Sequence, residues 1–189
     1  WEDQITFGDG NSRGIELLLK KTRGRLTGWI GYTLAKTDRK FDLINRGERY
    51  PFKYDRRHDI SVTGVYQLKK NVEVSGSWVY GTGNAVTLPV RTVKVKSFTN
   101  PVSELTTNID NFEGRNGFRQ RAYHRLDLSI SWKKQKHWGE RTWSVGAYNL
   151  YSRRNPFFLR ATEDLDGNRK FRQMSLFPIL PFIRYSFNF

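Results

Sequence analysis

Few side chains in this sequence have the types and spacing that catalysis or metal binding requires. The 189 residues contain no cysteine, and the three histidines, His58, His124 and His137, lie far apart along the chain. The lack of cysteine excludes disulfides, thiolate metal sites and cysteine nucleophiles, and the histidine spacing does not fit a zinc site. Because no nucleophile or paired carboxylate accompanies the histidines, the sequence predicts neither an enzyme nor a bound cofactor or metal ion.

Two charged runs are the remaining candidates for a binding site. The run Asp55-Arg56-Arg57-His58-Asp59 suits either an anionic ligand or a network of ion pairs, and we favour the ion pairs. The run Asp164-Leu165-Asp166-Gly167-Asn168 lacks the later glutamate of an EF-hand loop, so a plain turn is the favoured interpretation. His58 and His124 fit hydrogen-bonded side chains better than catalytic bases.

Apolar and polar residues alternate along most of the chain, which is typical of β-strands with one apolar and one polar face. This pattern predicts about seven antiparallel strands, at 12–22, 25–38, 57–68, 72–80, 123–134, 141–152 and 178–189. The clearest strand, 123–134, has four apolar side chains in phase: Leu126, Leu128, Ile130 and Trp132. In the last strand the apolar face carries Ile183, Tyr185, Phe187 and Phe189, and Arg184 lies on the other face.

The connections between these strands alternate in length. Short turns at 23–24, 69–71 and 135–140 alternate with long segments at 39–56, 81–121 and 153–174, which we interpret as irregular loops. Soluble sandwiches do not usually separate their loops in this way, whereas outer-membrane barrels have short periplasmic turns and long outer loops. Most of the strands also reach the roughly 9–11 residues that cross a bilayer at a tilt. We therefore expect an all-β transmembrane barrel with its turns and its carboxyl terminus on the periplasmic side.

This fold assigns a role to each strand face. The lipid-facing side chains are expected to be Leu126, Leu128, Ile130, Trp132 and Ile183, and the lumen or rim candidates are Asp55, Arg56, Arg57, His58, Asp59, Glu73, Arg125, Asp127 and Arg184. Aromatic girdles are expected from Trp29, Trp78, Tyr80, Trp132, Trp143 and Tyr151. Because bacterial barrels have an even number of strands and hydrocarbon tolerates no open edge, we expect residues 1–189 to be the C-terminal segment of a larger barrel.

Several segments together resemble the TonB-dependent outer-membrane receptors, over nearly the whole chain. They are residues 10–17 (GNSRGIEL), 54–59 (YDRRHD), 122–128 (AYHRLDL), 148–151 (YNLY) with Asn155-Pro156, and the aromatic C-terminus. The resemblance implies a barrel of about 22 strands, an N-terminal plug and a TonB-contacting box, with the plug and N-terminal strands lying outside this chain. It also implies energy-dependent import of a large solute, such as a siderophore, cobalamin, glycan or peptide.

The resemblance further implies partners for the chain in the outer membrane of a Gram-negative bacterium. These are outer-membrane lipid and lipopolysaccharide, the remainder of the receptor, the inner-membrane TonB complex and the barrel-assembly machinery, with a surface lipoprotein as a further candidate. Tyr185, Phe187 and Phe189 are similar to the C-terminal signal that the assembly machinery recognises.

Two other function classes are compatible with the sequence. One is a small outer-membrane barrel or adhesin with a structural or surface-binding role. The other is a soluble β-module that binds nucleic acid, because the net charge is +15. Since the basic residues lie mostly in loops and turns rather than along one face, contacts with lipopolysaccharide phosphates are favoured over nucleic acid.

Overall fold

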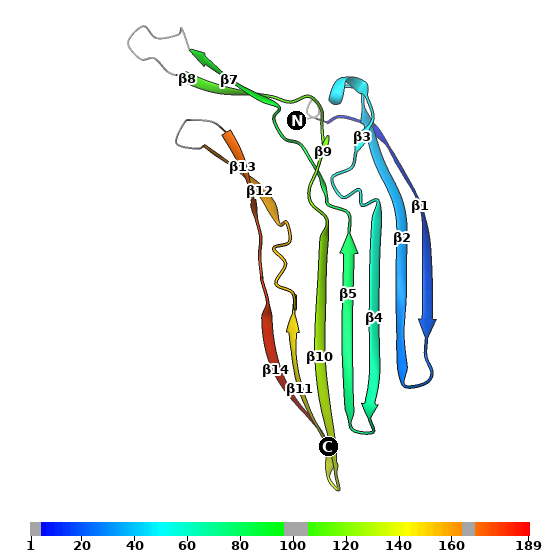
Figure 1. Ribbon diagram of the computed structural model, residues 1–189. Helices are drawn as coiled ribbons and strands as arrows, with labels where there is room; N and C mark the ends of the chain where they lie inside the picture. Colours follow the sequence, from blue (N-terminus) through cyan, green and yellow to red (C-terminus); the bar gives the residue numbers. More distant parts are fainter. Residues whose placement is uncertain (1–4, 97–105, 164–168) are drawn as a thin grey trace.

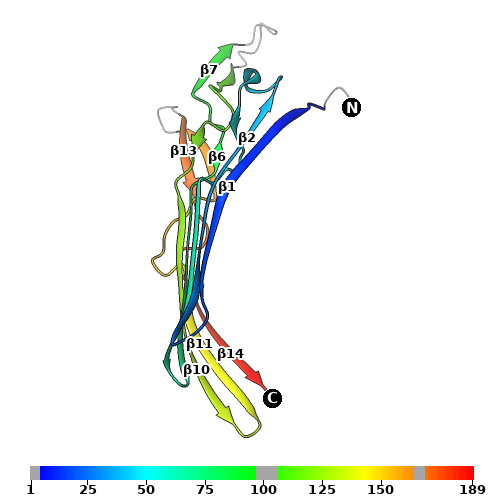
Figure 2. The same ribbon diagram turned by 90° about the vertical axis from the view of Figure 1, so that its right-hand side faces the viewer.

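Seven long strands form one antiparallel sheet in the order β1-β2-β4-β5-β10-β11-β14 (Figure 1). The computed structural model describes residues 5–96, 106–163 and 169–189. The strands are β1 (Gly8–Lys21), β2 (Leu26–Phe41), β4 (His58–Lys69), β5 (Val72–Gly81), β10 (Tyr123–Lys136), β11 (Gly139–Tyr148) and β14 (Leu180–Asn188). The all-β fold with about seven antiparallel strands is thus confirmed. Figure 2 shows the sheet as a single curved layer.

The sheet has no second layer to enclose a hydrophobic core. Only four apolar residues of the described chain are buried: Tyr50, Val72, Ala85 and Ala147. Large apolar side chains on the strands stay open, including Leu17 at 61% exposure, Leu19 at 70% and Ile183 at 73%. An apolar sheet face must be covered by another element or by an apolar solvent. The fold therefore suits the wall of a barrel in a bilayer. No helix among the described residues has the length and apolar character to cross a membrane.

The hairpin turns step along the sheet, as the strand stagger of a barrel requires. Cross-strand pairing places Leu26, the first residue of β2, at the same level of the sheet as Ile130 of β10. The successive pairs are Leu26–Tyr66, Tyr66–Val74 and Val74–Ile130. β10 continues six residues beyond Ile130, to Lys136. That shift is about 20 Å along the strands, and the two hairpins lie about four strand spacings, or about 19 Å, apart across the sheet. The strands consequently tilt by roughly 45° to the line of turns, as in membrane barrels.

The short connections are the expected turns and lie at one end of the sheet with the carboxyl terminus (Figure 1). In the β1–β2 turn Gly24 has φ 94°, a conformation that glycine adopts without strain. The β10–β11 turn is tighter than the expected 135–140, because β10 and β11 pair as far as Lys136 and Gly139.

The interpretation of the long segments as irregular loops is wrong in part. β2 extends to Phe41 and is followed by the one-turn helix η2 (Asn45–Gly47) and by β3 (Tyr50–Pro51), which pairs with β2. The other long segments contain three further strand pairs, formed by β6 (Ala85–Val86) with β9 (Phe118–Arg119), β7 (Arg91–Lys96) with β8 (Thr106–Asn111), and β12 (Phe158–Glu163) with β13 (Arg169–Met174). These pairs lie beyond the end of the sheet opposite the turns (Figure 1).

Both edges of the sheet carry free backbone groups. β1 and β14 each have one partner strand, β2 and β11, and their outer sides pair with no described strand. Every residue of β1 is exposed. In hydrocarbon an unpaired edge costs several kcal/mol per group, so the backbone groups of both edges need hydrogen-bond partners if the sheet lies in a membrane.

Candidate functional site

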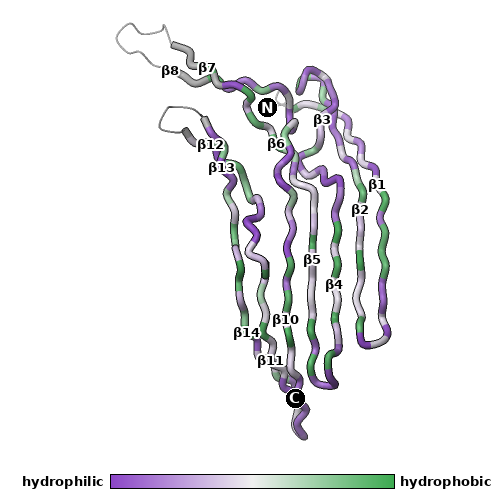
Figure 3. Tube along the Cα trace, in the orientation of Figure 1, coloured by the Kyte–Doolittle hydropathy of each residue, from purple (hydrophilic) through white to green (hydrophobic). Residues whose placement is uncertain are grey.

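The register of the strands separates the expected residues into two faces. Glu73, Arg125, Asp127 and Arg184 share one face, which we call the polar face. Leu126, Leu128, Ile130, Trp132 and Ile183 share the other, the apolar face, where Ile130 pairs with Val145 and Val145 with Ile183. Figure 3 shows the resulting alternation of hydropathy along each strand. Which solvent meets each face remains a prediction.

Small hydroxyl side chains cover the middle of the polar face. Three hydrogen bonds link them across neighbouring strands: Thr63 to Ser77 at 3.2 Å, Ser75 to Ser129 at 2.7 Å and Ser131 to Ser144 at 2.8 Å. Nearer the turns, Glu73 forms an ion pair with Lys133 at 3.2 Å, and Arg184 lies three strands from Glu73 in the same row, which runs through Ser131 and Ser144. Of the expected lumen or rim residues, Glu73, Arg125, Asp127 and Arg184 therefore share a face but do not form one cluster, and His58 lies on the apolar face.

Aromatic side chains gather near both ends of the apolar face. The outer band consists of Tyr32, His58, Trp78, Tyr80, His124 and Tyr151, and the turn-side band of Trp132, Trp138, Trp143, Tyr185 and Phe187. On β10 His124 and Trp132 are eight residues apart, or about 26 Å along the strand and roughly 20 Å along a barrel axis at the usual tilt. Two bands around an apolar belt of this height are typical of outer-membrane barrels. Trp29 was expected in a girdle but lies on the polar face, since it pairs with Thr63.

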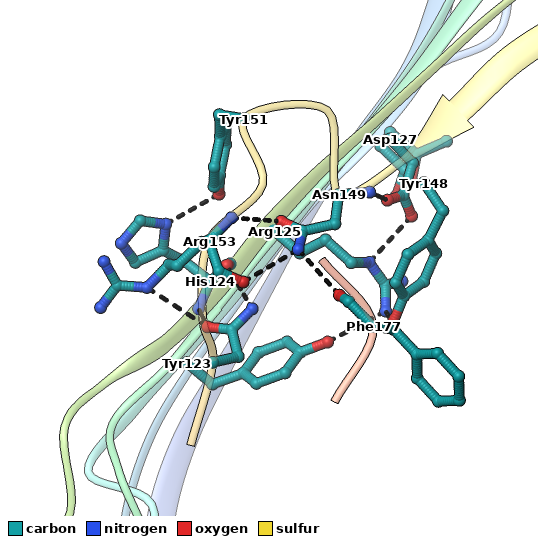
Figure 4. A network of polar contacts seen from close by, with 12 residues as sticks. Tyr123, His124, Arg125, Asp127, Tyr148, Asn149, Tyr151, Arg153 and Phe177 are labelled. Atoms are coloured by element: carbon teal, nitrogen blue, oxygen red, sulfur yellow. Dashed lines mark hydrogen bonds and ion pairs between the residues drawn. The ribbon is translucent and has the colours of Figure 1, made fainter. Parts of the chain in front are cut away.

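An ion-paired group around Arg125 and a separate hydrogen bond of His124 mark the outer end of β10 (Figure 4). On the polar face the Arg125 guanidinium donates to Asp127 at 2.9 Å and to the Tyr123 and Tyr148 hydroxyls. On the apolar face a hydrogen bond of 2.7 Å joins His124 Nδ1 and the Tyr151 hydroxyl. Desolvation by partial burial raises the pKa of the Tyr151 hydroxyl. The same strand thus ends in polar contacts on both faces.

Asn149 closes β11 and holds the chain that leads into β14. Its backbone lies at φ 52° and its amide N–H donates to Asp127 Oδ1 at 2.9 Å. The side chain is fully buried; it donates to the carbonyls of Arg153, Phe177 and Pro178 and accepts from the Arg153 N–H. The predicted strand 141–152 therefore ends four residues early. The signal was present in the sequence, because Asn149 interrupts the apolar alternation.

The side chains of Asn155 and Asp55 form hydrogen bonds with backbone groups that have no neighbouring strand to pair with. The Asn155 amide accepts from the His124 N–H at 3.0 Å and donates to the His124 carbonyl at 2.9 Å, as a strand residue would. Asp55 Oδ1 likewise accepts the Thr37 N–H at 2.6 Å. Since an unpaired buried backbone group is costly, these side chains let the strand pairing end without orphaned donors.

Replacing Asn149 with alanine is expected to lower the free energy of unfolding by about 2–3 kcal/mol, because several buried carbonyls and an N–H lose their partner. Asn149→Gly should be about 1 kcal/mol less damaging, since glycine accepts the positive φ. Urea unfolding of the purified receptor, followed by heat modifiability on gels, measures both. Asn71→Ala, in the exposed β4–β5 turn, is the control and should change stability by less than about 0.5 kcal/mol.

The charged run at 55–59 takes part in ion pairs, but its residues contact different partners and do not form one network. The buried Asp55 carboxylate, 2% exposed, pairs with Arg119 of β9 at 2.6 Å. Arg56 and Asp59 form an exposed pair at 3.3 Å. His58 Nδ1 and the Tyr32 hydroxyl are 2.9 Å apart, and the Arg57 carbonyl accepts from the Ala35 N–H. Arg119, which was not among the residues expected from the sequence, makes the shortest of these contacts.

Four polar contacts attach the segment 82–122 to the segment 42–57. Besides its ion pair with Asp55, Arg119 donates to the Asp55 carbonyl at 2.6 Å and, within its own segment, to the Gly83 carbonyl at 3.0 Å. Asn116 donates to the Pro51 carbonyl at 2.9 Å, and Asn45 Oδ1 accepts from the Arg115 N–H at 2.9 Å. The two outer segments therefore form one structural unit.

Two adjoining cavities lie among the outer segments and share Glu113 and Gly114 as lining residues. The first, of about 410 Å³, has two arginines in its wall and is lined by Ile44, Asn45, Arg46, Thr87, Phe112, Glu113, Gly114 and Arg115. The second, of about 610 Å³, is mainly apolar and is lined by Leu88, Pro89, Val90, Glu113, Gly114, Gly117, Phe118 and Phe171. Phe171 comes from β13, so the second cavity joins two outer segments.

The structure contains no cluster that suits a metal ion within the ranges it describes: no group of three His, Cys, Asp or Glu side chains is close enough. The acidic run 164–168 lies outside the described residues.

Comparison with known protein families shows which family the chain belongs to. Residues 3–150 match the family described as TonB dependent receptor-like, beta-barrel. The chain belongs to this family. The match covers the strands from β1 to β11, so the predicted resemblance is confirmed, and the sheet is a segment of an outer-membrane receptor barrel. The family is one of receptors and transporters of the Gram-negative outer membrane rather than of enzymes. No curated protein and no solved structure matches the chain.

Family membership indicates which environment each face of the sheet is expected to meet. A barrel in the outer membrane presents apolar side chains to lipid and polar side chains to its interior. The hydroxyl-rich face with Glu73, Arg125, Asp127 and Arg184 is then the candidate lumen. The unit formed by the outer segments, with its two cavities, is the candidate site for contact with a solute.

Proposed function

We propose that residues 1–189 form the C-terminal part of a TonB-dependent receptor that imports a large solute across the outer membrane, using energy from the inner membrane. A plug domain and further N-terminal strands of the parent protein would complete it. The solute classes considered are siderophores, cobalamin, glycans and peptides. The observation that carries the proposal is a tilted sheet with open edges, one apolar and one polar face, in a chain that matches the family over residues 3–150.

The open edges support a larger barrel over a complete small barrel or adhesin. β1 and β14 lie at opposite ends of the strand order and are not paired with each other. A closed barrel of seven strands would pair them, and hydrocarbon does not tolerate free edges. We propose that strands of the parent receptor bind both edges, and that the apolar face meets outer-membrane lipid through Leu126, Leu128, Ile130, Trp132 and Ile183.

The distribution of charge supports a binding role for the outer segments. Segments 39–57, 82–122 and 153–174 contain 19 Lys and Arg residues against 9 Asp and Glu, a net +10 of the chain's +15. Such a surface attracts anions, including lipopolysaccharide phosphates and acidic solutes. Because this charge lies at one end of the sheet rather than along a groove, we do not propose nucleic acid as a partner.

Further partners are proposed on the basis of the family. They are the inner-membrane TonB complex, reached through the N-terminal part of the receptor, the barrel-assembly machinery, and a surface lipoprotein over the outer segments. Tyr185 and Phe187 lie on the apolar face of β14, in contact with Trp143 and Trp138, and Phe189 contacts Phe187. We propose these three aromatic residues as the assembly signal.

Uptake by whole cells tests the proposed function. The gene encoding this chain is deleted, and cells are screened with labelled members of the four solute classes. We expect the deletion strain to stop accumulating solutes of one class and to accumulate them again when the intact gene is restored. Accumulation should stop again when TonB is removed or the proton gradient is collapsed. Uptake that persists without TonB and without a proton gradient would contradict energy coupling. Wild-type uptake of every class in the deletion strain would contradict an import role.

A further inference from the structure

We infer that the two adjoining cavities of the outer segments form one bipartite subsite for an amphipathic anion, a solute that joins an apolar ring to an acidic group. This inference rests on the proposed function, because it names the kind of solute that the receptor captures.

The size and lining of the larger cavity suit an apolar group. Its volume of about 610 Å³ lies within the roughly 300–1,000 Å³ of small-molecule sites. Phe118 and Phe171 supply two rings from different segments, and Leu88, Pro89 and Val90 supply aliphatic surface. Phe118 is 48% exposed and Phe171 37% exposed. Aromatic walls of this kind bind a ring by stacked or edge-to-face contact.

The smaller cavity has two arginines in the part of its wall that it does not share with the larger cavity. Arg46 and Arg115 line it, opposed by one carboxylate, that of Glu113. Guanidinium groups are the side chains best suited to carboxylate, sulfonate or phosphate groups. Since Glu113 and Gly114 line both cavities, an acidic group in the smaller cavity is adjacent to a ring in the larger one. The net charge of +10 on the outer segments also disfavours a cationic solute.

Both arginines belong to backbone that is held in place. The turn that carries Arg46 is held by hydrogen bonds from the Gly47 N–H to the Ile44 carbonyl and from the Glu48 N–H to the Asn45 carbonyl. Asn45 Oδ1 accepts the Arg115 N–H, and the Arg115 guanidinium lies 5.9 Å from the centre of the Tyr50 ring. The ion pair between Asp55 and Arg119 fixes the residue that follows Phe118. A site held in this way loses less conformational entropy when a solute binds.

The test compares two probes of the same length and ring, 4-phenylbutyrate and 4-phenylbutylamine. Their binding to the complete receptor in lipid nanodiscs is titrated by saturation-transfer NMR, with empty nanodiscs as the reference. We expect the carboxylate to bind at least about fivefold more tightly than the amine, which corresponds to one favourable exposed charge pair. Equal affinities, or a preference for the amine, would overturn the inference.

Variants separate the two halves of the subsite. Arg46→Gln and Arg115→Gln are each expected to weaken the carboxylate about three- to fivefold without weakening the amine. Phe118→Ala and Phe171→Ala are expected to weaken both probes about three- to tenfold. Arg121→Gln and Phe157→Ala, exposed residues of the same segments outside both cavities, are the matched controls and should leave both affinities unchanged. If the four cavity variants behave like these controls, the inference is wrong.

The outcome is independent of the import assay. A receptor that imports a solute but shows no carboxylate preference would overturn this inference alone. A receptor that binds 4-phenylbutyrate as described but imports nothing would count against the proposed function and leave the subsite intact.

Discussion

Replacing Leu128 with arginine is expected to keep the receptor from reaching a stable form in the outer membrane. Leu128 lies midway between the aromatic bands of β10, two residues from Leu126 and two from Ile130, and it packs against the position of Gly76 on β5. Arginine at the midplane of a lipid-facing strand costs about 2–4 kcal/mol. Ile130→Arg should behave in the same way, and the double variant should be worse than either single variant.

Ser131→Arg is the matched control for these arginine variants. Ser131 lies on the same strand but on the polar face, where it pairs with Glu73 across the β5–β10 ladder. We expect an arginine there to meet a carboxylate and water rather than lipid. Yield in purified outer membranes, together with heat modifiability on gels, distinguishes the variants. Equal losses for Leu128→Arg and Ser131→Arg would mean that the two faces do not differ in solvent.

Asp55→Ala is expected to release the outer segments from one another while the sheet stays folded. The substitution removes the buried carboxylate from the Thr37 N–H and from Arg119, which keeps 32% of its side chain exposed. Breaking a buried ion pair costs about 3–5 kcal/mol; we expect about 3, since the partner that remains can reach water. Hydrogen exchange of the Thr37 amide should then accelerate about a hundredfold.

A second aspartate in the same run provides the control for Asp55→Ala. Asp59 pairs with Arg56 at 3.3 Å, and both side chains are nearly half exposed. An exposed pair contributes at most about 1 kcal/mol, so Asp59→Ala should leave exchange at Thr37 almost unchanged. If Asp59→Ala accelerates exchange as much as Asp55→Ala does, the buried pair is not what joins the two segments.

The sequence predicted the sheet well because its period-two pattern and its turns are local signals. Leu126, Leu128, Ile130 and Trp132 fall on one face by spacing alone, and Arg23-Gly24 marks a turn without any knowledge of its partners. The shift of the turns along the sheet was not predicted. It depends on which residues pair across strands far apart in sequence, such as Val74 with Ile130.

The outer segments were predicted poorly for a related reason. Their organisation depends on side chains that reach across 60 or more residues, such as Arg119 to Asp55 and Asn116 to Pro51. Neither contact has a periodic signature. β12 and β13 are also charged, with Arg160 opposite Arg172, so their composition resembles that of a loop. The two cavities follow from these contacts and were therefore invisible in the sequence.

Asn149 is a position where an interruption of the apolar alternation coincides with the end of a strand. It broke an otherwise apolar face of the predicted strand 141–152. In the structure it ends that strand, and its amide joins three carbonyls that lead toward β14. Here, a polar residue that interrupts the apolar face near the end of a predicted strand marks the point where the strand ends and the chain turns away.

Single-cysteine scanning of β10 tests the central claim, that one face of this sheet meets lipid and the other meets water, most directly. The chain contains no cysteine, so each substitution adds one thiol to it. Residues 125–132 are changed in turn and the complete receptor, in intact outer membranes, is treated with a membrane-impermeant maleimide. We expect labelling at Ser129 and Ser131 and protection at Leu126, Leu128 and Ile130. Uniform labelling along the strand, or the reverse alternation, would contradict the account.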